Sequence, residues 1–341
     1  MAVAQTALDT KRYDRQIRLW GMETQLRMST TRVLICGAGG LAAEVAKNLV
    51  LAGVGHVTLQ DHARVTADDL SRGGQFLLGD AEVGASRAEA SLPFLRGLNP
   101  TVTVDACTDD ARAATAEHLA QFDLVIATEL HFDDVLKLGA LVRAARELHT
   151  ETPAKRARVA AADEGGHVPA RRRVHLFAAG AVGLYGWAAL DLGEYVYSVT
   201  TKKKGADGEE TSETSAASIS YPTVEAAFAH VSAARQPADI ATILTAHRAF
   251  HCAEDVRVSA QRTLERLGLP QDTLSAALLD ELAPHAAPAL APVCAILGGL
   301  LGQEAIKVIS GKDTPIDNIV LLDTVAPPPN SGARVIRLAP P

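Results

Sequence analysis

The residues best suited to chemistry lie in a glycine-rich turn near the start of the chain. Gly37, Gly39 and Ala42 match the pattern G-x-G-x-x-G/A, and Asp61 ends the next apolar run. Small residues let a backbone approach a phosphate at a helix N-terminus, and an acid at the following strand tip can accept hydrogen bonds from ribose hydroxyls. The pattern indicates nucleotide-binding ancestry. It does not decide whether the turn still binds a nucleotide, because any tight strand-to-helix turn favours glycine.

Polar side chains in the segment after Asp61 form a second candidate. Ligands of parallel sheets bind in the loops at the carboxyl ends of the strands, and Arg72, Gln75 and Arg87 could reach a phosphate there. Solvated surface positions would explain the same residues, and their spacing does not choose between the two interpretations.

Two arginines near the N-terminus form a third candidate. Arg15 and Arg18 lie three residues apart in the segment YDRQIRLWG, so a helix would place them on one face. The planar guanidinium group matches phosphate oxygens, and an N-terminal element could carry it to a phosphate in another subunit. A surface salt bridge is the simpler alternative.

Other reactive side chains do not assemble into a recognisable site. The four cysteines are widely separated and include no CxxC pair, which predicts neither a zinc site nor a disulfide framework. His247 and His251 lie four residues apart without the intervening glutamate of a metalloprotease, so we interpret them as a feature of a helix surface. We therefore predict no metal site in this chain.

The composition is that of a globular protein without a basic field for nucleic acid. The 341 residues include 33 Lys and Arg against 40 Asp and Glu, a net charge of −7, and the hydrophobic content of 48% excludes wholesale disorder. The apolar run at 286–302 contains Pro288 and Pro292, which predicts a buried helix starting near Pro292 rather than a membrane span. We expect a soluble protein.

Alternating strand and helix patterns position the candidate residues. Residues 32–36 are typical of a buried strand, 41–53 have helical spacing, and 56–61 form a second strand. This unit and its repetition predict an α/β fold with a doubly wound, mostly parallel Rossmann-like sheet. The predicted divisions are a Rossmann-like half with an N-terminal arginine-bearing helix over 1–150, a basic loop or linker over 151–172, a strand region over 173–201, a mobile charged loop over 202–218, a helical segment over 219–285, and a closing helix and strand over 286–341.

Several of these segments together resemble the enzymes that activate ubiquitin-like modifiers, within the ThiF/MoeB-like superfamily. The resemblance is carried by YDRQIRLWG at 13–21, GAGGLAAEVAKNLVLAGV at 37–54, QFLL at 75–78, VGASRAEAS at 83–91 and PVCAILGGLLGQEAIKVISG at 292–311. Within that family, the sequence is similar to the non-catalytic small subunits of SUMO-activating enzymes.

The resemblance implies a heterodimer in which this chain is a pseudo-adenylation domain with a helical insertion. A large catalytic subunit would bind ATP and magnesium and adenylate a SUMO-like modifier, and this chain would not be active alone. The turn at Gly37–Ala42, with Asp61, would form a degenerate nucleotide site. Arg15 matches the family arginine that reaches across the dimer to the γ-phosphate of the partner's ATP, so the resemblance implies that role in trans.

Departures from the active members of the family favour the non-catalytic assignment. Active members carry a lysine where this chain has Arg87, and a magnesium-binding aspartate just after the fourth strand, where this chain reads Thr128-Glu129-Leu130-His131. One alternative is a self-sufficient homodimeric enzyme that adenylates a sulfur-carrier or ubiquitin-like protein. Another is a nucleotide-linked dehydrogenase. The sequence places no His or Lys in a second domain to act as the acid that such an enzyme needs.

Basic residues in the predicted loop bear on location. Lys155-Arg156 and Arg158 precede the arginines at 171–173 by about a dozen residues, the layout of a two-part nuclear-import signal. A solvated loop is the alternative. We expect a nuclear location, alone or together with a cytoplasmic pool.

Overall fold

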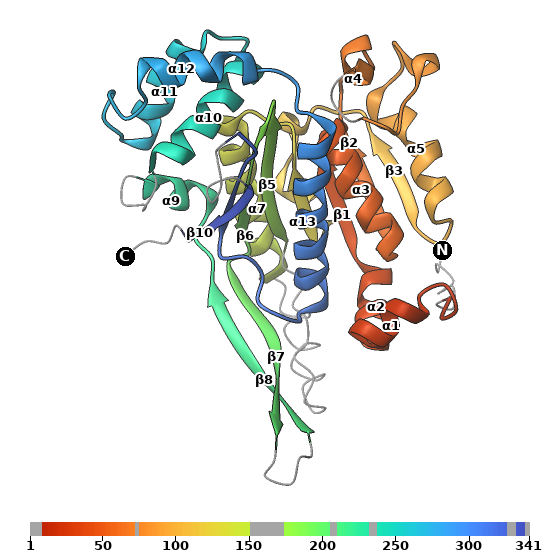
Figure 1. Ribbon diagram of the computed structural model, residues 1–341. Coiled ribbons are helices and arrows are strands. Elements are labelled where there is room, and N and C mark those ends of the chain that lie inside the picture. Colours follow the sequence, from red (N-terminus) through yellow and green to blue (C-terminus); the bar gives the residue numbers. More distant parts are fainter. Residues whose placement is uncertain are drawn as a thin grey trace.

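The computed structural model describes residues 9–71, 75–150, 174–204, 210–231, 237–325 and 332–337. An eight-stranded sheet of order β10-β9-β6-β5-β4-β1-β2-β3 forms its centre, and helices cover both faces (Figure 1). Its strands are β1 (Arg32–Cys36), β2 (His56–Gln60), β3 (Thr103–Cys107), β4 (Leu124–Ala127), β5 (His175–Val182), β6 (Tyr185–Asp191), β9 (Ile319–Asp323) and β10 (Gly332–Ile336).

The part of the sheet around β1 is parallel, as the alternating pattern predicts. β1 pairs with β2 and β4, β2 pairs with β3, and β4 pairs with β5, all in parallel register. Every residue of β4 is buried, and in β1 only Arg32 is partly exposed, as expected for strands covered on both faces. β6, β9 and β10 extend the sheet in antiparallel register. The predicted α/β fold with a mostly parallel central sheet is confirmed.

Two layers of helices enclose the sheet. The first contains α3 (Gly40–Ala52), α5 (Arg87–Leu98) and α13 (Ala291–Ser310), whose apolar residues form one core with the strands. The second core lies on the other face, under α6 (Ala116–Leu119), α7 (Phe132–Thr150), α9 (Val224–Ala229), α10 (Pro237–Cys252), α11 (Val256–Leu267) and α12 (Ala276–Leu282). Connections contain α4 (Ala67–Ser71) and 3-10 turns at Asp80–Glu82, Ala111–Ala113 and Ala283–His285.

Two short helices precede the sheet, and the chain turns between them at Gly21. α1 (Asp14–Trp20) and α2 (Met22–Thr30) flank this residue, whose φ of 85° favours glycine. β1 begins directly after α2, so both helices lie at the edge of the sheet where the parallel strands start (Figure 1).

The closing helix α13 is the core helix that its sequence predicts. It packs along α3, and an added Cβ at Gly298 would lie 2.5 Å from the Cβ of Glu44, so only glycine permits this approach. Among the described residues, α13 is the one helix with the length and hydropathy of a membrane span, but 56% of that apolar window is buried inside the fold. Its apolar character is explained by its packing against α3 and the sheet.

A long hairpin replaces the loop predicted over 202–218, of which residues 205–209 lie outside the described residues. β7 (Glu194–Lys204) and β8 (Glu210–Ser220) pair in antiparallel register and extend away from the sheet (Figure 1). The charged composition suggested a loop, but antiparallel neighbours in the chain can pair their backbones locally, and the many Thr, Val and Tyr residues favour strands. The predicted basic loop over 151–172, with its import-signal residues, lies outside the described residues.

Candidate functional site

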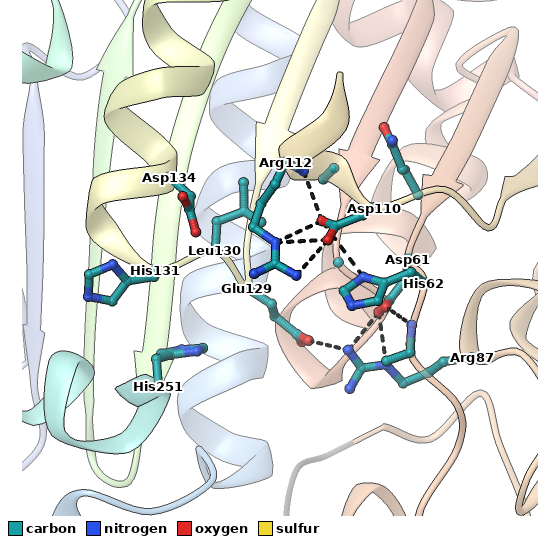
Figure 2. A pocket seen from close by; sticks show the side chains of 14 residues that line it. Asp61, His62, Arg87, Asp110, Arg112, Glu129, Leu130, His131, Asp134 and His251 are labelled. Atoms are coloured by element: carbon teal, nitrogen blue, oxygen red, sulfur yellow. Dashed lines mark hydrogen bonds and ion pairs between the residues drawn. The ribbon is translucent and has the colours of Figure 1, made fainter. Parts of the chain in front are cut away.

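A cavity of about 240 Å³ lies at the carboxyl ends of the parallel strands. The strand order reverses between β1 and β4, and open α/β sheets bind ligands in the crevice at such a switch point. The loops that follow β2, β3 and β4 contribute side chains to its wall (Figure 2), and Gly37 contributes backbone from the turn after β1. The lining residues with polar side chains are Gln60, Asp61, His62, Arg87, Asp110, Arg112, Glu129, His131, Asp134 and His251.

The predicted glycine turn joins β1 to α3 at this cavity. Gly37 directly follows β1 with a φ of 102°, and an added Cβ there would lie 2.7 Å from Thr128 Oγ1. Gly39 is the N-cap residue of α3, and Ala42 is buried inside that helix. The turn therefore has the geometry of a strand-to-helix phosphate loop, in which the first backbone N–H groups of α3 have no partner within the helix.

Asp61, the acid predicted at the tip of β2, is turned toward the protein. Its side chain is only 5% exposed. Oδ2 accepts a hydrogen bond from the Ala38 N–H at 2.9 Å, and Oδ1 accepts one from the Ala63 N–H at 2.8 Å. The carboxylate thus fixes the glycine turn to the loop after β2, and its oxygens are already engaged.

Arg87 lies at the centre of three carboxylates. Its guanidinium group contacts Asp61 Oδ2 at 2.6 Å and Glu129 Oε2 at 3.0 Å (Figure 2). It also contacts Asp69 Oδ1 at 2.9 Å. The side chain is 17% exposed. Burial by itself would lower the pKa of Arg87, but the charges of Glu129, Asp61 and Asp69 outweigh it and raise that pKa. Arg87 is therefore always positively charged, and its charge is paired with carboxylates of the same chain.

Gln75 also lies inside the fold instead of reaching toward a ligand. Its Nε2 donates to the carbonyl oxygen of Ala38, and its Oε1 accepts from the Leu77 N–H at 3.2 Å. Arg72, the remaining residue of that candidate group, lies outside the described residues. Gln75 therefore supports the backbone of the glycine turn.

Arg15 lies on α1, which a buried tyrosine attaches to the fold. The Tyr13 hydroxyl lies 2.7 Å from Thr101 Oγ1 and accepts a hydrogen bond from Asn99 Nδ2 at 2.8 Å. The Tyr13 ring fills the space above Gly53, where an added Cβ would lie 2.6 Å from the ring. Arg15 itself is exposed and makes no ion pair or side-chain hydrogen bond with any described residue. Its neighbour Arg18 pairs with Asp14 at 3.0 Å.

Arg15 and the glycine turn lie at opposite ends of α3. Gly39 caps the N-terminus of this helix, whereas Gly53, against which Tyr13 packs, is its C-cap. The helix has 13 residues, and at 1.5 Å per residue it spans about 20 Å. Figure 1 shows α1 beside the end of α3 that is remote from the cavity. Arg15 is thus placed away from the cavity of its own chain.

Comparison with known proteins identifies the family. Residues 13–327 match the ThiF family. The chain belongs to the ThiF family. Over 92% of its length it is 31% identical to SUMO-activating enzyme subunit 1 of Xenopus tropicalis and 32% identical to that of Danio rerio, in each case covering 92% of the relative. It is 26% identical to the DNA damage tolerance protein RHC31 of Saccharomyces cerevisiae, again over 92% of this chain.

Two solved structures share the fold of this ThiF-family chain. E. coli MccB, solved with succinimide, aligns with a TM-score of 0.55 at 13% identity, covering 96% of this chain and 71% of MccB. PaaA aligns with a TM-score of 0.58 at 15% identity, covering 99% of this chain and 86% of PaaA. At these identities the likeness concerns the fold alone.

Glu129 is the residue of the ThiF-type cavity that sequence analysis missed. It was noted only as a departure from an expected aspartate, without a role of its own. Its side chain comes from the loop after β4 and faces both the glycine turn and Arg87 (Figure 2). Burial raises the pKa of Glu129, Arg87 opposes the rise, and Asp61 and Asp69 add to it. An acid directly after a buried strand, opposite a glycine turn, was the signal available in the sequence.

The histidine pair of α10 corrects the prediction of a helix-surface feature. His247 is 1% exposed, with its ring centroid 5.7 Å from that of Trp187 and 4.2 Å from that of His251, whose ring is tilted by 43°. Burial lowers the pKa of His247 well below its usual value, and burial together with His131 lowers the pKa of His251 to about 4. Helical spacing shows that the two rings share a face, but only the docking of α10 on the sheet buries that face.

Proposed function

We propose that this chain is the non-catalytic subunit of a heterodimeric enzyme that activates a ubiquitin-like modifier, with SUMO as that modifier. In this proposal a large catalytic subunit binds ATP and magnesium and adenylates the C-terminal glycine of the modifier. The observation that carries the proposal is the relationship to SUMO-activating enzyme subunit 1, which extends over 92% of both chains at 31% identity.

The contribution proposed for this chain is one arginine supplied to the partner. Arg15 is exposed at an edge of the molecule remote from its own cavity, and it has no partner among the described residues. A guanidinium group near the γ-phosphate would stabilise the charge that develops on pyrophosphate as the modifier's carboxylate attacks the α-phosphate. Helices α1 and α2 also carry exposed apolar side chains, Leu19, Met22 and Leu26, which offer a surface for the partner.

The cavity of this chain does not fit ATP and magnesium. The space over the glycine turn holds the Glu129 carboxylate, and the guanidinium group of Arg87 beside it is already shared by three carboxylates. A triphosphate would meet negative charge where it needs positive charge. We therefore place no step of the adenylation in this cavity.

The same residues count against the alternative of a self-sufficient homodimeric adenylating enzyme. Such an enzyme needs a cavity that accepts phosphate in each chain. Here Arg87 stands where active relatives carry a lysine, and it binds Asp61, Asp69 and Glu129 of its own chain. The heterodimer requires no such cavity in this subunit.

Exchange of labelled pyrophosphate into ATP tests the proposed function. We expect no exchange by the purified chain with SUMO, and rapid exchange once the catalytic subunit of the SUMO-activating enzyme is added. Co-elution of the two chains in size-exclusion chromatography is the expected physical correlate. Exchange by the chain alone would refute the proposal and favour the homodimer.

A nuclear location is proposed on the sequence alone, from the basic residues at 155–158 and 171–173. A fluorescent fusion should accumulate in the nucleus, and replacing the arginines at 171–173 by serine should redistribute it. A wild-type fusion that stays out of the nucleus would contradict this proposal and leave the enzymatic one intact.

A further inference from the structure

The Glu129 carboxylate occupies the space directly over the glycine turn. An added Cβ on Gly39 would lie 1.6 Å from Glu129 Oε1 and 2.4 Å from its Cδ, so the carboxylate rests on the glycine itself. The backbone of Gly39 acts to lower the pKa of this carboxyl group, against the rise that burial causes. At Gly37, an added Cβ would lie 3.0 Å from the Cβ of Glu129. Both glycines are thus covered by one side chain from the loop after β4.

This is the place where a phosphate loop holds its anion. The first N–H groups of a helix are unpaired within the helix and favour negative charge. In α3 the N-cap residue Gly39 has no side chain with which to accept a bond from these groups. Glu129 brings an anionic group to that end from a different part of the sheet.

Arg87 holds the carboxylate in this position. Its Nη2 donates to Glu129 Oε2 at 3.0 Å, while Nε and Nη1 donate to Asp61 at 2.8 Å and Asp69 at 2.9 Å. One guanidinium group among three carboxylates leaves the site negative overall. The raised pKa of Glu129, caused first by burial and then by Asp61 and Asp69, agrees with this crowding of acids. A second anion would therefore be repelled.

We propose that Glu129 is a tethered substitute for a phosphate group, which occupies the anion position of the glycine turn and keeps nucleoside triphosphates out of this chain's own cavity. Removing the carboxylate uncovers the α3 N-terminus and leaves Arg87 with two carboxylates instead of three. The proposal concerns one chain and needs no partner. It goes beyond the proposed function, which assigns the exclusion of nucleotide to no particular residue.

Direct binding to the full-length chain tests this proposal. Isothermal titration calorimetry with magnesium-ATP, and separately with inorganic pyrophosphate, would compare the wild type with Glu129→Ala, Glu129→Gln and the control Glu89→Ala, an exposed glutamate on the same helix as Arg87. We expect no binding at millimolar concentration by the wild type or the control. For Glu129→Ala we expect affinity at least ten times higher, weakened by salt, and for Glu129→Gln a smaller gain because the amide still fills the space.

A stability cycle tests the same contact without any ligand. In the wild type, Gly39→Ala should lower the urea midpoint of unfolding markedly, because its methyl group collides with the Glu129 carboxylate. In the Glu129→Ala background the same change should lower the midpoint far less.

Two results would overturn the proposal: ATP binding by the wild type as tight as that of Glu129→Ala, or equal effects of Gly39→Ala in both backgrounds. Neither result bears on pyrophosphate exchange by the complex, so this inference and the proposed function can fail separately.

Discussion

Two arginines at opposite ends of the parallel strands show how neighbouring residues decide what a charged side chain can do. Arg87, at the edge with the cavity, is mostly buried and contacts Asp61, Asp69 and Glu129. Arg15, at the edge where the strands begin, is exposed and has no partner among the described residues. Both have the planar fork that suits phosphate. Only Arg15 has its fork available for a ligand.

The difference separates two kinds of anion chemistry in one chain. At the cavity, the carboxylate of Glu129 and the guanidinium group of Arg87 both belong to this chain and pair with each other. At α1, Tyr13 supplies a rigid attachment while the charge next to it stays in solvent. In the proposed function, the arginine that serves a phosphate is therefore the one on α1, away from the cavity.

The largest expected effect comes from removing the exposed arginine. In the proposed complex, Arg15→Ala should reduce modifier-dependent pyrophosphate exchange by about three orders of magnitude, since arginines supplied in trans contribute about three to five in comparable phosphoryl transfers. The complex should still form in size-exclusion chromatography. Arg18→Ala is the matched control on α1, where Arg18 pairs with Asp14, and it should change exchange less than threefold or so. Equal losses in both variants would remove the special role of Arg15.

The buried arginine should matter for stability in the isolated chain. Arg87→Ala leaves three carboxylates without their cation, and we expect the free energy of unfolding to fall by about 3 kcal/mol in urea denaturation. Arg112→Ala is the control at the same cavity, because the Arg112 side chain that pairs with Asp110 is exposed to solvent and its loss should change the free energy of unfolding far less. If Arg87→Ala were no less stable than this control, the ion pairs of Arg87 with Asp61, Asp69 and Glu129 would not stabilise the folded chain.

The histidine pair of α10, His247 and His251, should make the free energy of unfolding depend on pH. Because the folded state holds the pKa of His251 near 4, below the usual 6.5, the unfolded state binds the proton more tightly and stability is lost as pH falls below 6.5. From pH 6.5 to 5 the free energy of unfolding should fall by about 2 kcal/mol from this residue. His251→Asn should make that dependence less steep, with His247 still contributing, whereas His62→Asn, at an exposed position, should leave it unchanged. An unchanged slope in His251→Asn would contradict the burial of this pair.

The smallest effect concerns the attachment of α1. Tyr13→Phe removes the hydroxyl that bonds Thr101 and Asn99 but keeps the ring against Gly53, so we expect about 1 kcal/mol lower stability in urea. Pyrophosphate exchange by the complex should fall far less in Tyr13→Phe than it does in Arg15→Ala. Tyr197→Phe, whose hydroxyl bonds no described residue, should leave both quantities unchanged. A large loss of exchange in Tyr13→Phe would mean that the hydroxyl itself positions Arg15.

Local patterns predicted the elements well where burial follows from a short stretch of sequence. The run at 32–36, the turn at Gly37 and the helix that follows are visible because a strand buried on both faces is apolar throughout. The hairpin of β7 and β8 was missed because its charged composition was weighed above its strand-forming residues. The burial of His247 was missed because helical spacing does not say which face meets the sheet.

The sequence by itself determined the sheet, the glycine turn at its switch point, the helical N-terminus with Arg15, and the family to which these belong, because each is recorded in neighbouring residues. Only the tertiary structure decided the state of the cavity. Arg87 and Glu129 are 42 residues apart in the chain, and Glu129 reaches Gly39 only because β4 lies beside β1. Whether a charge is available for a ligand depends on such contacts, and no local pattern contains them.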